Sequence, residues 1–154
     1  MKTNAIRILE SRQVDHTTHE YEFSEEEIDA VSVAHKINAD PVTVFKTLVA
    51  RNEKNELFVF VIPGNYELNL KKAASTSGNK KIEMIKVKEL QPLTGYIRGG
   101  CSPVGMKKLF PTFIDETAQL HNKIFVSAGM RGMQIKISPD DLILTVNGQF
   151  ADLI

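Results

Sequence analysis

The chain has 154 residues, 42% of them hydrophobic and 25% charged, which is the size and composition of one globular domain. Its 19 basic and 19 acidic residues cancel, and this balance argues against a protein that coats nucleic acid by bulk charge. A single cysteine excludes an internal disulfide, and no apolar run approaches the roughly 20 residues that span a bilayer. We therefore expect one cytoplasmic domain, residues 1–154, with no membrane anchor.

The N-terminal segments predict a helix followed by a strand. Thr3 is a suitable cap for a helix in which apolar residues recur at helical spacing. The next segment, HTTHEYEF at residues 16–23, alternates and predicts a strand. That alternation would put His19, Tyr21 and Phe23 on one face of the strand.

Two more helices and a hairpin are expected next. Ser24 and Glu27 form the S-x-x-E pattern of a capping box, which predicts that the second helix begins there. Asp40 and Pro41 supply the cap and the first residue of a short third helix. The apolar runs on either side of NEKN, residues 52–55, predict a β-hairpin.

The second half of the chain interleaves helices and strands. LNLKKAASTSG predicts a helix that ends at Gly78, and KIEMIKV predicts either a strand or a strand that runs into a short helix. Ser138 and Pro139 predict the start of a late helix. Three strand-like segments precede it: TFIDE, KIFVSAG and MQIKIS. Because several neighbouring strands look hairpin-linked, we expect a mixed α/β fold, a β-barrel-like sheet with peripheral helices, rather than a doubly wound parallel sheet.

The segment GGCSPVG, residues 99–105, contains the only cysteine. A catalytic thiol needs a base, and none of the four histidines lies in a recognisable cysteine-hydrolase signature. We therefore expect Cys101 to be a small buried apolar residue. His16 and His19 would lie on opposite faces of a strand, and no further cluster completes a ligand set, so we expect no metal and no other cofactor.

Two glycine-rich turns and one lysine are candidates for a site. The 99–105 segment is either a plain turn or a backbone nest whose N–H groups approach a ligand oxygen. SAGMRG, residues 127–132, is a second glycine-bracketed turn and carries Arg131. Lys46, within the apolar VFKTLV, is either an ordinary surface lysine or a donor to an ester carbonyl, with Thr47 adding a hydroxyl.

Taken together, TGYIRGGCSPVGMKK, VFKTLV and VSAGMRG resemble the YbaK/EbsC family, the free-standing relatives of the editing domain inserted in bacterial prolyl-tRNA synthetase. The order of motifs matches nearly end to end, including the closing FADLI. The resemblance implies an aminoacyl-tRNA deacylase that removes mischarged cysteine from tRNA(Pro). Such an enzyme has a physical purpose, because a pocket distinguishes near-isosteric amino acids by only ~1–3 kcal/mol.

The resemblance also implies roles for individual residues. Lys46 matches the family's essential lysine, which orients the aminoacyl ester or the tRNA end. Gln134 is a departure, since the family often has an acidic residue there, and Cys101 stands where an aliphatic residue is common. The other matches are expected to bind substrate: Tyr21, Thr47, Gly99, Gly100, Ser102, Pro103, Ser127, Gly129 and Arg131.

For cysteine, the resemblance implies that the substrate's own thiol attacks its ester carbonyl and releases a cyclic thiolactone, whereas water would attack an alanyl or other aminoacyl ester. The implied partners are the tRNA(Pro) acceptor end and prolyl-tRNA synthetase. The alternative is a non-catalytic module that binds nucleic-acid ends or a synthetase, to which lysine pairs at 71–72, 80–81 and 107–108 would contribute. A thiol hydrolase built on Cys101 is a third, weaker alternative.

Overall fold

Side-chain caps determine where the first and last helices begin. In the computed structural model, which describes residues 2–154, Thr3 Oγ1 accepts a hydrogen bond from the Ile6 N–H at the start of α1 (Asn4–Ser11). Ser138 Oγ does the same for α5 (Pro139–Val146). Both starts were predicted, because a cap is a local signal that needs no tertiary partner.

Helix α2 (Ala30–Lys36) begins later than predicted. Its N-cap is Asp29, whose carboxylate accepts hydrogen bonds from the Ser32 N–H at 3.1 Å and the Ser32 hydroxyl at 2.7 Å. The predicted capping box is wrong, since the Glu27 N–H donates to the Ser24 carbonyl in a turn. The two hydrogen bonds that Ser32 gives to the Asp29 carboxylate determine the start of the helix.

Five strands form the larger sheet, in the order β4-β2-β3-β5-β8. The predicted hairpin is present, with β2 (Phe45–Asn52) antiparallel to β3 (Leu57–Pro63) along its length. Strands β5 (Thr112–Asp115) and β8 (Gln149–Ala151) extend the sheet in parallel. On the other side, β4 (Ile82–Met84) pairs only with the last three residues of β2.

The smaller sheet has the order β1-β7-β6 and is antiparallel throughout. It contains β1 (His16–Glu20), β6 (Ile124–Ser127) and β7 (Met133–Ile137). An isolated bridge between Val44 and Phe125 connects it to the start of β2. The mixed α/β class is confirmed, and the strands within residues 2–154 form two joined sheets and no closed barrel.

The remaining elements are short. The predicted third helix is one 3₁₀ turn, η1 (Pro41–Thr43), and α3 (Leu70–Ser77) ends at a left-handed Gly78, as expected. After β4 the chain enters α4 (Val87–Thr94), which is the second of the two alternatives for that segment. Neither η2 (Glu116–Leu120) nor β8 was predicted, because elements of three to five residues show little periodicity.

Strand β1 ends earlier than predicted, at Glu20. The next N–H, of Tyr21, still donates to the Gly132 carbonyl at 2.9 Å, but Gly132 lies just outside β7, so no partner strand remains beyond that point. Tyr21 and Phe23 therefore belong to a loop, although Tyr21 still packs against the cluster of Phe125, the residue whose ring His19 contacts.

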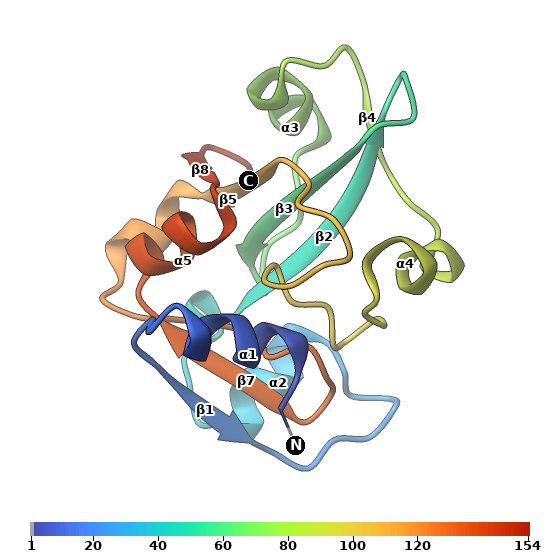
Figure 1. Cartoon of the computed structure of the whole chain (residues 1–154). Coiled ribbons are helices and arrows are strands. Elements are labelled where there is room, and N and C mark those ends of the chain that lie inside the picture. Colours follow the sequence, from blue (N-terminus) through green and yellow to red (C-terminus); the bar gives the residue numbers. More distant parts are fainter. Residues whose placement is uncertain (1) are drawn as a thin grey trace.

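Alternate side chains of β2 face two different cores. Phe45 and Val49 pack in a cluster with α1, α5 and the small sheet, whereas Ala50 packs in a cluster with α3. Figure 1 shows the small sheet with α1 and α2 at one end of the β2–β3 hairpin and α3 near the other end. By the same alternation Thr47 shares a face with Phe45, and Lys46 lies on the opposite face.

None of the helices within residues 2–154 is both long and apolar enough to cross a bilayer.

Candidate active site

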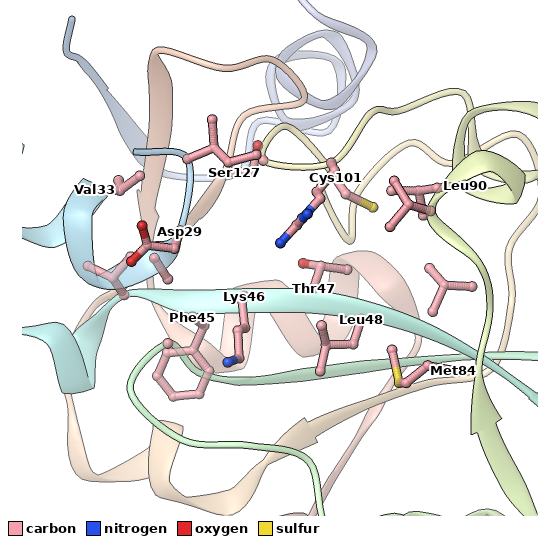
Figure 2. Close-up of a pocket in the computed structure, with 18 of the residues that line it drawn as sticks. Asp29, Val33, Phe45, Lys46, Thr47, Leu48, Met84, Leu90, Cys101 and Ser127 are labelled. Atoms are coloured by element: carbon pink, nitrogen blue, oxygen red, sulfur yellow. The ribbon is translucent and has the colours of Figure 1, made fainter. Parts of the chain in front are cut away.

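A pocket of about 370 Å³ lies along the edge of β2 that faces away from β3. Among the described residues, no strand pairs with positions 45–48 on that edge, because β4 begins to pair only at Ala50. The pocket walls come from the start of α2, from residues 84–90, from residues 98–101 and from the small sheet. Figure 2 shows Asp29 and Val33 toward one end of β2 and Met84 and Leu90 toward the other.

Lys46 lines this pocket and is only partly exposed to solvent. Burial lowers the pKa of Lys46, while the negative charges of Glu67 and Asp29 act in the opposite direction. Within residues 2–154 its ammonium forms no ion pair, so its three N–H donors remain available to a ligand. Figure 2 shows Lys46 and Thr47 on opposite sides of the β2 ribbon.

Two polar atoms in the pocket walls lack a hydrogen-bond partner. They are Thr47 Oγ1 and Gln134 Oε1, both buried. Gln134 is 5% exposed and lies on β7, opposite Ser127 of β6. Buried polar atoms are usually paired, so the two atoms indicate where a ligand would complete the structure.

The 99–105 segment forms the wall opposite β2, and its glycines allow close packing. Gly99 has a left-handed φ of 82°, and a β-carbon there would come within 2.8 Å of Ile28 Cβ. A β-carbon at Gly100 would meet the backbone of Met130 and Arg131 at 3.0 Å. The two glycine turns therefore pack directly against each other at Gly100.

Arg131 connects the two turns from outside the pocket. Its Nε donates a hydrogen bond to the Arg98 carbonyl at 2.9 Å. Ser127 lines the pocket, and its Oγ accepts a hydrogen bond from the Gly129 N–H. The second turn thus orders the first turn and contributes one hydroxyl to the wall.

The structure places the sequence-predicted residues in two groups. Lys46, Thr47, Gly99 and Ser127 line the pocket. The others lie behind it or beside it: Tyr21 in the loop after β1, Gly100 and Arg131 at the contact between the turns, Gly129 at a φ of 98°, Ser102 buried within the 99–105 segment, and Pro103 on the far side of that segment.

Cys101 lines the pocket but is suited to packing. It is buried, and burial raises the pKa of its thiol to about 12. The nucleophile in cysteine chemistry is the thiolate, which this environment disfavours. Histidine is absent from the described residues that line the pocket, so no imidazole is placed to take its proton.

Sequence reasoning missed the residues at the pocket mouth. Lys86 and Arg98 are exposed there, beside Met84 and Val87, which are 42% and 62% exposed. Arg98 directly precedes the glycine pair and could have been noticed for that reason. Lys86 had no such signal, because only the fold brings the start of α4 to this edge of β2.

Three of the proteins that resemble this chain bear directly on the site. The chain is 51% identical over 152 residues to EbsC of Enterococcus faecalis, named for a proposed Cys-tRNA(Pro)/Cys-tRNA(Cys) deacylase activity, covering 99% of this chain and 93% of EbsC. It is 28% identical over 80 residues to the proline–tRNA ligase of Brachyspira hyodysenteriae, covering 52% of this chain and 14% of the ligase. The crystal structure of a proposed trans-editing enzyme for prolyl-tRNA synthetase matches with a TM-score of 0.84 and 25% identity, covering 99% and 98% of the two chains.

The family model agrees with these relatives. The model of the aminoacyl-tRNA editing domain matches residues 25–144, which include β2, both glycine turns and every residue that lines the pocket. The chain belongs to the aminoacyl-tRNA editing domain family.

Proposed function

We propose that this protein is a deacylase that removes cysteine mischarged on tRNA(Pro). The observation that carries the proposal is the pocket in which a partly buried, unpaired Lys46 lines the same space as the Gly99 turn. The 51% identity to EbsC supports the choice of cysteine. The site of action would be the cytoplasm, where aminoacyl-tRNA is used.

The pocket favours a reaction in which the substrate supplies its own nucleophile. Cys101 is held as a neutral thiol, and the Ser127 hydroxyl already accepts a hydrogen bond from the Gly129 N–H. In the proposed step the cysteine sulfur of the substrate bonds to its own ester carbonyl carbon. The carbon–oxygen bond to the ribose then breaks, the ribose oxygen takes up a proton to replace the one that the thiol loses, and a thiolactone leaves.

The role of the protein in this step is to position the ester and to stabilise charge. Lys46 would donate a hydrogen bond to the oxygen that becomes negative as the sulfur attacks. The walls on either side of the ester would hold the thiol within reach of the carbonyl, and such positioning supplies several kcal/mol in well-oriented reactions.

The mouth of the pocket supports a nucleic-acid end as the carrier of the ester. Lys86 and Arg98 are exposed there and form no ion pair within residues 2–154, so both can face phosphates. Met84 and Val87 offer apolar surface beside them, which suits the face of an unstacked base. We propose that the acceptor end of tRNA(Pro) lies here and that prolyl-tRNA synthetase is the source of the mischarged substrate.

The test is a deacylation panel with cysteinyl-, alanyl- and prolyl-tRNA(Pro). We expect rapid ester loss from the cysteinyl substrate and none above background from the prolyl control. No ester loss on any substrate would contradict the proposal, and tRNA binding without ester loss would favour the non-catalytic module. Preferential loss of alanine would support a deacylase in which water, and not a substrate thiol, is the nucleophile.

A further inference from the structure

Three buried side-chain polar atoms within residues 2–154 have no hydrogen-bond partner, and two of them line this one pocket. Those two are Thr47 Oγ1, from the larger sheet, and Gln134 Oε1, from the smaller sheet. The bridge between Val44 and Phe125 joins the two sheets three residues before Thr47 and two residues before Ser127, the β6 partner of Gln134. Leaving such atoms unpaired is costly, so their presence in a pocket wall indicates a ligand group.

The chemistry of the pocket restricts what that ligand group is. Lys46 is a cation on one side of β2, so a second cation is repelled from that side. Asp29 is the one acidic residue among the described pocket residues, but it is exposed, and its carboxylate caps α2 by accepting hydrogen bonds from Ser32. The buried acceptors without a partner in the described pocket walls are Gln134 Oε1 and Thr47 Oγ1.

We propose that Gln134 and Thr47 bind the α-ammonium group of the aminoacyl ester and thereby select esters that carry this group. This inference rests on the deacylase function proposed above. It places the ester carbonyl toward Lys46 and the amino group toward the small sheet. The amide and hydroxyl oxygens accept charge-assisted hydrogen bonds from the ammonium, and neither group adds a charge of its own to the pocket.

The test compares two esters on the same tRNA, cysteinyl and 3-mercaptopropanoyl. They differ only in the α-amino group, and each enzymatic rate is divided by the uncatalysed rate of the same ester. We expect the wild type to prefer the cysteinyl ester by about tenfold to a hundredfold, the usual effect of a hydrogen bond to a charged group. Gln134→Leu should lower kcat/KM for the cysteinyl ester and leave the other ester unchanged, so that the preference falls to within a few-fold of one.

Two further variants keep the inference falsifiable if Gln134→Leu does not fold. Gln134→Glu retains an acceptor and should preserve the preference, and Thr47→Val should reduce it by a smaller factor. An equal loss on both esters in Gln134→Leu, a lost preference in Gln134→Glu, or a preference removed by Asp29→Asn would overturn the assignment. A wild type that cleaves neither ester would instead mean that the proposed function has failed.

Discussion

The 99–105 segment has a front, which faces the pocket, and a back, which faces α1 and the core, and the two differ in what they contact. On the front, Gly99 and Cys101 line the pocket across from β2. On the back, the Tyr96 hydroxyl donates to the Val104 carbonyl at 2.7 Å, and Asn4 Nδ2 donates to the Gly105 carbonyl at 2.7 Å. One segment thus serves the site with one face and is fixed to α1 and the core by the other.

The two faces of this glycine-rich segment are restrained to different degrees. The back of the segment is strongly restrained: Ser102 is fully buried, and its hydroxyl accepts the Val104 N–H. The front is left with backbone and a small side chain, which leaves room for a ligand. Substitutions on the two faces should therefore separate activity from stability.

The largest effect is expected on the β2 side of the pocket, at Lys46. Lys46→Ala removes the partly buried lysine of the pocket, and loss of one such donor typically costs about 10²–10³ in rate. Single-turnover deacylation of cysteinyl-tRNA(Pro) measures this loss. The urea midpoint should stay near that of the wild type, because Lys46 forms no ion pair within residues 2–154. An unchanged rate would show that Lys46 takes no part in the reaction.

The second effect is expected on the back of the segment. Tyr96→Phe leaves the buried Val104 carbonyl without its donor, which should lower the free energy of unfolding by about 1–3 kcal/mol. Urea denaturation measures this change. The rate per folded molecule should be nearly unchanged at low temperature. A large loss of rate in a stably folded variant would show that the two faces are not separable.

The third effect concerns the mouth of the pocket. Lys86→Ala and Arg98→Ala should each lower kcat/KM for full tRNA severalfold and reduce the salt dependence by about 0.7 for each lost phosphate contact. Lys88→Ala is the matched control, since Lys88 is exposed on the same helix but does not line the pocket. Aminoacyl-adenosine, which has no phosphate, should be cleaved equally by all of them. Equal effects of the Lys86 and Lys88 variants would contradict this assignment.

The fourth effect is a pH dependence at the wall formed by α4. Arg51 pairs with Glu89 at 2.6 Å and 3.3 Å, and this contact, aided by the Lys86 N–H, lowers the pKa of Glu89 from 4.5 to about 2. A lowered pKa contributes stability that is complete above the unfolded value and is lost as the pH falls through the folded value. The difference in free energy of unfolding between wild type and Glu89→Gln should therefore be constant above about pH 5. It should shrink as the pH falls from about 4.5 toward 2. Urea midpoints across that range measure it, and a difference that grows with acid would contradict the pairing.

The smallest effect is expected at Cys101. Cys101→Val keeps a small apolar side chain at the pocket wall, so turnover should stay within about twofold of the wild type. Iodoacetamide should label the native thiol slowly, because burial raises its pKa to about 12. Loss of activity in Cys101→Val would indicate that the enzyme thiol is the nucleophile.

Much of the fold could be predicted because its signals are local. Asp40 with Pro41, Ser138 and Gly78 mark helix ends through their own backbone contacts, and the β2–β3 hairpin follows from two apolar runs around a polar turn. The predicted start of α2 was wrong because two plausible caps, Ser24 and Asp29, lie within six residues of each other. Propensity alone does not decide between them.

The site could be predicted only in part. Lys46 and the glycine turns stand out in the sequence, but Gly99 and Pro103 are four residues apart and end on opposite faces of one segment. Gln134 reaches the pocket only because β7 pairs with β6 and β6 meets β2. Such neighbours are created by the tertiary fold, and no periodicity in the chain reveals them.

The central claim is that the pocket positions an ester whose own thiol attacks. The most direct measurement is single-turnover deacylation of cysteinyl-tRNA(Pro) beside seryl-tRNA(Pro), which exchanges the sulfur for an oxygen, with the Cys101→Val protein measured in parallel. We predict rapid loss of the cysteinyl ester, persistence of the seryl ester, and the same selectivity in the variant. Equal cleavage of both esters, or loss of activity in the variant, would contradict the account.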